Sequence, residues 1–285
     1  MTPIIRTENL NHTYSKNTPF ERHAIKGINF CAYPGEFIGV IGHTGSGKST
    51  FMQHLNGLLK PTAGTVYFDG TDIHASKENT RAARFQVGLV FQYPEYQLFE
   101  ETVAKDIAFG PKNMGLDEAE IQRRVTEFTA MVGLKAEHLE KSPFTLSGGE
   151  KRRAAIAGVM AMQPKVLILD EPTAGLDPKG RDEIIANMRA YHQETGATII
   201  MVTHSMEEIA RTVDRVVVMN DGQIAMDGSR AEIFSREAEL NAIGLAVPEI
   251  TQIAQRLKGM GLDLPDDIFT VEQAADAILR VRGGS

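Results

Sequence analysis

The chain has 285 residues, of which 42% are hydrophobic, and a formal net charge of −7 at pH 7. This length suits one large domain with an appendage, and the acidic balance argues against the basic surface of a nucleic-acid-binding protein. The lone Cys31 excludes an internal disulfide and, with no cleavable signal peptide evident, predicts a cytoplasmic protein. The apolar runs are far shorter than the roughly 20 residues that cross a bilayer, so a role at a membrane would act through partners.

The N-terminal part of the chain predicts a sheet. Short β-rich runs are separated by Gly, Pro, Asn and Asp, which are turn signals. A glycine-rich loop follows the third run and opens a stretch down to Leu58 that predicts a helix. The predicted strands are 4–10, 28–33, 37–41, 65–68 and 87–91.

The glycine-rich loop predicts a nucleoside triphosphate site, because it lies between a strand and a helix. Its glycines allow positive φ and let backbone N–H groups and the positive helix N-terminus approach phosphate oxygens closely. Lys48 is placed to reach the β- and γ-phosphates, and the Ser49 hydroxyl is placed to bind Mg²⁺. The loop residues are Gly42, His43, Thr44, Gly45, Ser46, Gly47, Lys48, Ser49 and Thr50.

The rest of the chain predicts a helical insertion, a parallel sheet and a helical C-terminal pair. Apolar residues at three-and-four spacing predict helices in the insertion, about 95–162, and strands alternating with a helix then predict a parallel core. Residues 229–246 are interpreted as a connecting segment. The last two helices are too small for a core of their own, so they pack on the main domain or on another subunit. The predicted helices are 102–109, 117–132, 147–162, 178–192, 248–260 and 270–281, and the later strands are 166–169, 198–202, 215–219 and 223–225.

Two adjacent carboxylates follow the apolar strand 166–169. The carboxyl end of such a strand points into the ligand crevice of an α/β sheet, where Asp170 can hold Mg²⁺. Glu171 lies one residue further and is the natural general base for an attacking water, a role that contributes roughly 10²- to 10⁴-fold in rate. The alternative is a pair of solvated acids at a strand end.

The order of the motifs resembles that of the ATP-binding cassette (ABC) family over residues 1 to about 228. The resemblance implies an α/β fold, a P-loop NTPase with an antiparallel β portion and an α-helical signature subdomain, binding ATP and Mg²⁺. The C-terminal unit 247–285 then forms a small helical dimerisation domain. The motifs are the glycine loop, Gln92, Leu146-Ser147-Gly148-Gly149-Glu150, the strand ending in Asp170-Glu171, Ala174-Gly175-Leu176-Asp177, and His204.

The resemblance also implies roles for four further residues. Gln92 would sense Mg²⁺ and the γ-phosphate as a hinge to the helical subdomain, and His204 would contact the γ-phosphate and orient water. Tyr14 would stack on adenine, although it could equally be a half-buried strand residue. Asp177 would communicate across a dimer, although it could instead cap the helix that begins at Pro178.

Ser147, Gly148 and Gly149 open a helix and predict a second phosphate clamp. In the family this clamp closes on the ATP of a partner subunit. Glu150 stands where the family usually has Gln, and we expect it to add charge but to leave the serine and glycine donors intact. The basic run Lys151 to Arg153 is expected to offset that charge on the helix surface.

Residues 91–103 and 106–111, with the C-terminal pair, are similar to the energy-coupling factor (ECF) type of cassette, in particular its second ATPase subunit. This resemblance implies an importer of vitamins or other micronutrients with three partners: a similar or identical second ATPase, a transmembrane coupling subunit and a substrate-capture membrane protein. The chain would lie peripherally at the cytoplasmic face of the membrane. We expect Glu95, Glu100 and Glu101 to bind coupling helices that carry an arginine.

Three different functions compete with this interpretation. A cobalt or nickel importer is the nearest of them, because the substrate is chosen by a separate membrane protein. A soluble cassette acting on ribosomes or DNA is disfavoured by the single cassette and the acidic balance. A regulator without hydrolysis conflicts with the presence of both Glu171 and His204.

Overall fold

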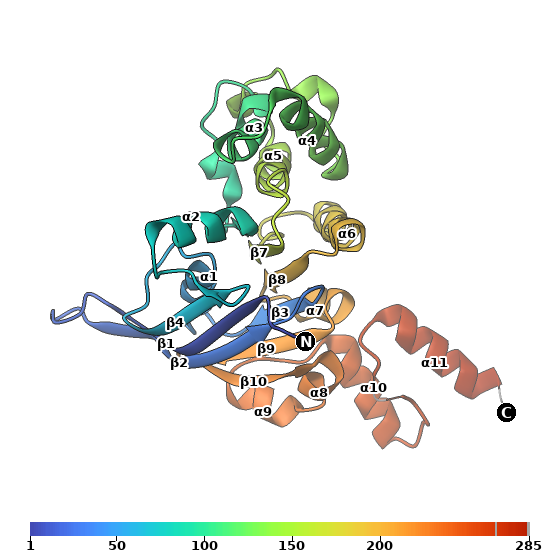
Figure 1. The fold of residues 1–285 in the computed structure, drawn as a ribbon. Helices are drawn as coiled ribbons and strands as arrows, with labels where there is room; N and C mark the ends of the chain where they lie inside the picture. Colours follow the sequence, from blue (N-terminus) through green and yellow to red (C-terminus); the bar gives the residue numbers. More distant parts are fainter. Residues whose placement is uncertain (266, 284–285) are drawn as a thin grey trace.

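The computed structural model describes residues 1–265 and 267–283, which form a six-stranded and a four-stranded sheet with helices around them (Figure 1). The strands are β1 (Ile5–Tyr14), β2 (Arg22–Ala32), β3 (Phe37–Ile41), β4 (Ala63–Phe68), β5 (Thr71–Asp72), β6 (Val87–Val90), β7 (Val166–Asp170), β8 (Thr198–Val202), β9 (Arg215–Asn220) and β10 (Gln223–Ser229). The helices are α1 (Lys48–Leu55), α2 (Lys77–Gln86), α3 (Val103–Asn113), α4 (Glu118–Met131), α5 (Gly148–Met160), α6 (Pro178–Thr195), α7 (Met206–Thr212), α8 (Arg230–Phe234), α9 (Glu237–Ala242), α10 (Glu249–Gly259) and α11 (Val271–Gly283), with 3₁₀ turns η1 (Pro94–Gln97), η2 (Ala136–His138) and η3 (Pro143–Thr145).

The six-stranded sheet carries the centre of the molecule. Its order is β10-β9-β3-β8-β7-β6, with β9 to β6 parallel and β10 antiparallel at one edge. Every residue of β3, β7 and β8 is buried, which explains why these strands read as continuous apolar runs. Because successive side chains point to opposite faces, Leu167 and Leu169 join one core while Val166 and Ile168 join the other. The predicted parallel core is confirmed.

The four-stranded sheet is antiparallel, in the order β2-β1-β4-β5. It packs with α1 in one apolar core, where the rings of Phe30 on β2 and Phe51 on α1 lie 5.4 Å apart, edge to face. The predicted antiparallel β portion is therefore confirmed, and it holds the helix that follows the glycine-rich loop.

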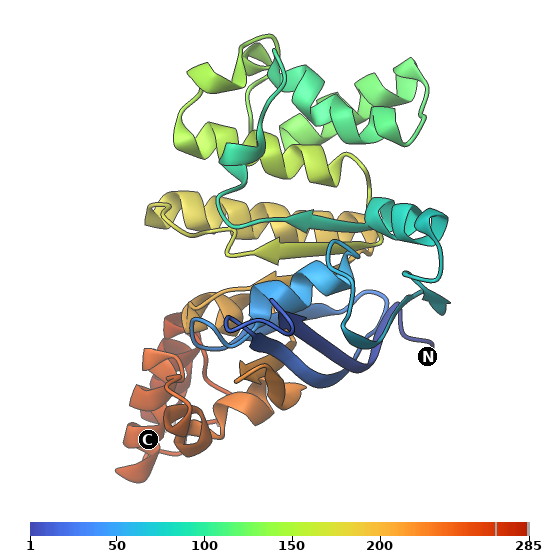
Figure 2. The same ribbon diagram turned by 90° about the vertical axis from the view of Figure 1, so that its left-hand side faces the viewer.

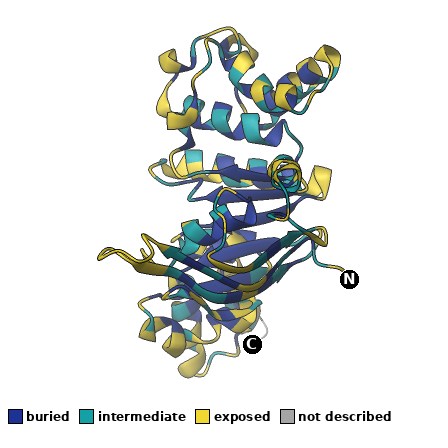
Figure 3. Cartoon of the chain, turned by 60° about the vertical axis from the view of Figure 1, so that its left-hand side comes forward, coloured by how far each residue is buried: buried dark blue, intermediate teal, exposed yellow. Residues whose placement is uncertain are grey.

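Helices α3, α4 and α5 form a group at one end of the molecule, with their buried sides turned toward one another (Figures 1 and 3). Each begins at a side-chain cap: Thr102, Asp117 and Ser147 accept a hydrogen bond from the first turn of α3, α4 and α5. Small buried residues on α5, such as Ala154 and Ala157, let it lie close to its neighbours. The predicted helical subdomain is confirmed, with each helix within a few residues of its expected bounds.

The C-terminal helices α10 and α11 lie at the opposite end from α3, α4 and α5 (Figures 1 and 2). The segment 229–246, for which the sequence predicted no secondary structure, contains α8 and α9. Phe269, before α11, packs against Phe234 of α8 with ring centroids 5.8 Å apart, so the pair is docked on the main domain. Of the predicted unit 247–285, residues 266, 284 and 285 lie outside the described residues.

Within 1–265 and 267–283, no helix combines the length and the apolar composition needed to cross a membrane.

Three histidines meet beneath α1. His54 is fully buried on α1, and His12 of β1 lies against it with ring centroids 4.7 Å apart. The pKa of His54 is lowered to about 4, mainly by burial and also by the charges of His12 and His74, while its hydrogen bond to the Leu59 carbonyl, 3.0 Å, opposes the change. The His54 Nε2 atom has no hydrogen-bond partner within the described part of the chain. His54 is thus held neutral inside the fold.

This burial makes the protein sensitive to acid. The pKa of His54 is depressed in the folded state, so its contribution is complete above about pH 6.5 and is lost as the pH falls toward 4, because the unfolded chain takes up a proton that the folded chain refuses. From pH 7 to pH 5 we expect a loss of about 2 kcal/mol in unfolding free energy from this one group. Urea unfolding at both pH values, compared with His54→Asn, measures it. Parallel pH profiles for the two proteins would contradict the assignment.

Candidate functional site

A polar pocket of about 310 Å³ opens at the carboxyl edge of β3 and β7. It gathers residues from the four-stranded sheet, the glycine-rich loop, the end of β6 and the end of β7, so segments far apart in the sequence meet there. Its lining is Tyr14, Arg22, Ala24, Thr44, Gly45, Gly47, Lys48, Ser49, Thr50, Gln92, Asp170 and Glu171. Most of the predicted nucleotide residues are therefore brought together, while Gly42, His43 and Ser46 complete the loop behind them.

The loop is shaped to receive a polyanion. Gly47, at φ 102°, precedes α1 without any side-chain cap, so the first N–H groups of the helix remain available. Lys48 donates from Nζ to the carbonyls of Gly42 at 2.7 Å and His43 at 3.0 Å. Burial lowers the pKa of Lys48, and the carboxylates of Glu171 and Asp170 oppose this change. The Ser46 hydroxyl is buried and has no partner among the described residues.

Asp170 and Ser49 form a set of oxygen donors that suits Mg²⁺. Asp170, at the end of β7, is only 6% exposed. Burial raises its pKa, while a hydrogen bond from Ser49 and the charge of Lys48 hold it down. A bound cation would favour the ionised carboxylate further.

Glu171 and His204 form a hydrogen-bonded pair beside the pocket. His204 Nδ1 lies 2.8 Å from Oε2 of Glu171, and the glutamate side chain is 12% exposed whereas the histidine is 76% exposed. Burial raises the pKa of Glu171, and His204 opposes the rise. A carboxylate of raised pKa is a better proton acceptor for water. Glu171 also has φ 53°, an uncommon conformation held by its N–H bond of 2.9 Å to the Val202 carbonyl.

The side of the pocket that Tyr14 lines is open. Tyr14 is 39% exposed and its hydroxyl lies 3.2 Å from that of Thr50. Its ring is accessible, and this partial exposure fits both the stacking role and the alternative of a half-buried strand residue. Arg22 also lines the pocket; sequence reasoning missed it because no motif marks the start of β2.

Glu208 of α7 was also missed. It accepts hydrogen bonds from Thr173 at 2.9 Å and Thr203 at 3.0 Å, and so ties the loop after Glu171 to the strand end before His204. Its position three residues after Ser205, a helix N-cap, is the only signal in the sequence.

The predicted signature clamp lies outside the pocket and is engaged within the chain. The Ser147 hydroxyl donates to Oε2 of Glu150 at 2.7 Å, and the Ser147 N–H donates to the same oxygen at 2.9 Å. The expectation that Glu150 leaves the serine donors free is therefore wrong: a carboxylate at the third helical position closes a capping box. Gly148 and Gly149 form the first turn of α5. Asp177 caps α6 through the Gly180 N–H at 2.7 Å, which confirms the capping alternative.

Two charged residues lie where the sequence did not predict them. Arg152 is 3% exposed, so it does not offset charge on the helix surface as expected. Its guanidinium pairs with Glu95 at 2.9 Å, and this glutamate is not free for a partner's arginine as predicted. Helical periodicity predicts which face of α5 is buried. It does not predict which distant carboxylate neutralises a buried cation on that face.

Comparison with known proteins places the chain in a family. The model of the ABC transporter family matches residues 25–174. The energy-coupling factor transporter ATP-binding protein EcfA2 of Clostridium perfringens (strain 13 / Type A) is 57% identical over 97% of this chain and 98% of that protein. The EcfA2 of Caldanaerobacter subterraneus subsp. tengcongensis is 53% identical over 99% of this chain and 98% of that protein.

Two solved structures have the same fold. That of cbiO1 from Clostridium perfringens, part of the ABC transporter complex cbiONQ, superposes with a TM-score of 0.75 at 39% identity over 90% of this chain and 100% of that one. A dimeric post-hydrolysis state of the ATP-binding cassette MJ0796, bound to ADP and Pi, gives 0.72 at 28% identity over 79% and 98%. The fold, the order of its motifs and the near full-length identity agree: the chain belongs to the ABC transporter family, among the ATP-binding proteins of energy-coupling factor transporters.

Proposed function

We propose that this chain is the ATP-hydrolysing subunit of an energy-coupling factor importer and works peripherally at the cytoplasmic face of the membrane. The observation that carries the proposal is the Glu171–His204 pair, 2.8 Å apart, beside a pocket that also holds Lys48 and Asp170. A base, a polyanion-binding loop and a carboxylate suited to Mg²⁺ are the parts that phosphoryl transfer to water requires. Relatives named EcfA2, which match this chain over nearly its whole length, support the transport role.

The residues divide the work. Lys48 and the N–H groups at the start of α1 bind the β- and γ-phosphates, and Tyr14 stacks on adenine. Ser49, Gln92 and Asp170 would hold Mg²⁺, which would neutralise charge on the phosphates. Glu171 accepts the proton of the attacking water, and His204 orients both the carboxylate and the γ-phosphate.

A second ATPase subunit, similar or identical, completes the site. In this arrangement Ser147, Gly148 and Gly149 of one subunit clamp the ATP held by the loop of the other, and Asp177 lies at the contact. Because the Ser147 hydroxyl is engaged by Glu150, it must turn away from that carboxylate to donate to a phosphate. Loss of the γ-phosphate then removes the charge that joined the subunits, and their separation drives the membrane partners.

Purification of the chain from its native membrane tests the proposal. We expect a second ATPase, a transmembrane coupling subunit and a small substrate-capture membrane protein to copurify. Reconstituted into vesicles, this assembly takes up its substrate only when ATP is supplied on the side of the ATPases. Recovery of the chain on ribosomes or DNA, or uptake without ATP, would contradict the proposal.

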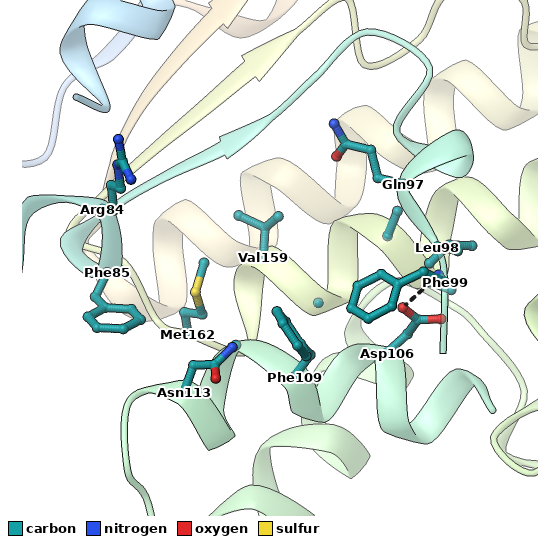
Figure 4. A pocket seen from close by; sticks show the side chains of 14 residues that line it. Arg84, Phe85, Gln97, Leu98, Phe99, Asp106, Phe109, Asn113, Val159 and Met162 are labelled. Carbon is teal, nitrogen blue, oxygen red and sulfur yellow. Dashed lines mark hydrogen bonds between the residues drawn. The ribbon is translucent and has the colours of Figure 1, made fainter. Parts of the chain in front are cut away.

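A groove on the helical group is the surface proposed for the coupling subunit (Figure 4). It has a volume of about 340 Å³ and lies between α3, α5, the end of α2 and the segment that follows η1. Two aromatic residues of its lining, Phe99 and Phe109, are 58% and 44% exposed, with rings 4.9 Å apart. Asp106 supplies the acidic group within the groove. Arg84 lies at the other end of the groove and donates to the Gly57 carbonyl at 2.9 Å. The groove therefore fits an amphipathic helix whose arginine lies at the Asp106 end.

Asp106 takes over the role that the sequence assigned to Glu95. Its carboxylate accepts hydrogen bonds from the N–H groups of Phe99 at 3.3 Å and Glu100 at 3.2 Å. Burial raises the pKa of Asp106 despite these bonds, so a guanidinium would find a poorly solvated partner. Glu101, by contrast, lies at the surface and pairs with Lys105 at 2.5 Å.

Neutralising this acid is expected to weaken the assembly. Asp106→Asn keeps a hydrogen-bond acceptor for the loop but removes the charge, so we expect about ten- to a hundredfold weaker binding of the coupling subunit. ATP binding by the isolated chain stays unchanged. Glu239→Gln, an exposed acid on α9, is the matched control. Binding measured on immobilised coupling subunit decides the question, and equal affinity of the two variants would contradict the docking site.

A cobalt or nickel importer is the second candidate function. The similarity to cbiO1 of the cbiONQ complex favours it over a soluble cassette that acts on ribosomes or DNA. The identity of the copurifying capture protein separates it from a vitamin importer.

A further inference from the structure

One buried guanidinium joins three segments of the chain that carry separate motifs. Arg152 lies on α5, one turn after the signature residues, and is 3% exposed. It contacts η1, which follows Gln92, and the loop 172–174, which follows Glu171. Among the described residues, no other charged side chain of comparable burial contacts all three of these segments.

The guanidinium of Arg152 donates hydrogen bonds from two edges of its plane. One edge binds Glu95 and the other binds two backbone carbonyls. Nε donates to Oε2 of Glu95 at 3.1 Å and Nη2 donates to Oε1 at 2.9 Å, a bidentate pair. Nη1 donates to the Pro172 carbonyl at 3.4 Å and to the Ala174 carbonyl. The Glu95 side chain is only 15% exposed. Breaking such a pair leaves a buried charge without a partner, which is strongly unfavourable. The position of the Arg152 guanidinium relative to Glu95 and to the two carbonyls is therefore fixed.

Arg152 holds the loop 172–174, which directly follows a residue in an uncommon backbone conformation. Glu171 has φ 53°, a left-handed conformation that is unfavourable for a residue with a side chain. Such a conformation persists only where the surroundings fix it. The carbonyls of Pro172 and Ala174, just after it, are among the groups that fix it.

We infer that Arg152 is a positioning residue that couples the two ATP sites of the assembled ATPase pair; the inference rests on the proposed function. In the proposed arrangement the N-terminus of α5 contacts the nucleotide of the partner, whereas Glu171 acts on the nucleotide of its own subunit. Arg152 links the two within one chain. A shift of α5 as the clamp closes at one site therefore moves the loop of the general base at the other, and Glu95 carries the same shift to the segment after Gln92.

The test compares Arg152→Lys with wild type in the complete transporter. Lysine keeps the charge, but its single ammonium group cannot hold Glu95 bidentately and both carbonyls together. We expect the Hill coefficient for ATP to fall from above 1 to about 1, and the maximal rate to fall about tenfold. Glu95→Gln keeps the bonds to the carbonyls, so we expect its maximal rate to fall less than that of Arg152→Lys while its Hill coefficient also drops.

A readout that does not depend on hydrolysis separates the inference from the function. In Arg152→Lys, amide hydrogen exchange in residues 172–177 should accelerate at least tenfold, while exchange in β7 and α6 stays unchanged. A wild-type assembly that does not hydrolyse ATP defeats the proposed function, and the exchange measurement still tests the contact. A wild-type Hill coefficient of 1, or a lysine variant with wild-type cooperativity and wild-type exchange, overturns the inference.

Discussion

Replacing Glu171 with glutamine is expected to lower ATP hydrolysis by the assembled transporter about 10²- to 10⁴-fold, the range that a general base contributes. Glutamine has nearly the same shape and can still accept the hydrogen bond that links Glu171 to His204. It cannot take a proton from water. ATP binding, which we propose depends on the loop and Lys48, should stay within about twofold of wild type because neither is altered. The variant should therefore accumulate closed ATPase pairs that hold uncleaved ATP.

Turnover measured at saturating ATP, with light scattering to detect the closed pair, checks both halves of this expectation. Glu183→Gln, on the outer part of α6, is the control for loss of a carboxylate in general. The pH profile adds a second check. Since burial raises the pKa of Glu171, wild-type turnover should fall as the pH decreases through that raised value. The base assignment fails if Glu171→Gln hydrolyses ATP at the wild-type rate.

The central sheet and the glycine loop were predictable because their signals are local. Strands buried on both faces must be apolar throughout, and 37–41 and 198–202 were predicted with the bounds that β3 and β8 have. The phosphate loop follows from glycines, a lysine and a hydroxyl at fixed spacing between a strand and a helix. Asp170 and Glu171 follow from their place at the end of β7. Local sequence signals of this kind can be interpreted without knowing the contacts between distant segments.

The contacts between distant segments could not be predicted. Arg152 and Glu95 are 57 residues apart in the chain, and only the packing of η1 on α5 brings them together. Both residues were expected at the surface, because charged side chains are mostly exposed. The engagement of Ser147 by Glu150 is local, but the choice between capping the helix and binding a phosphate is set by what lies opposite. Helices α8 and α9 are too short for periodicity to reveal them.

Gly47→Ala is expected to abolish nucleotide binding and to destabilise the fold by more than about 3 kcal/mol. Gly47 has φ 102°, and a Cβ placed there would lie 2.6 Å from the Ala24 carbonyl oxygen and 3.2 Å from the Ile25 side chain. The first of these is backbone of β2, held within the four-stranded sheet, so it cannot turn aside as a flexible side chain could. The loop itself has to move, and with it the N–H groups proposed to contact the phosphates.

Gly70→Ala is the matched control for this experiment. Gly70 also has a positive φ, 76°, but a Cβ there meets nothing within 4 Å. It therefore carries the conformational cost alone, about 1 kcal/mol, and ATP should still raise its unfolding temperature as it does that of the wild type. Titration with a fluorescent ATP analogue and urea unfolding, applied to both variants, separate the cost of the backbone conformation from that of the steric clash at position 47. If Gly47→Ala binds the analogue as tightly as Gly70→Ala, then close backbone packing of the loop against β2 is not what shapes the phosphate site.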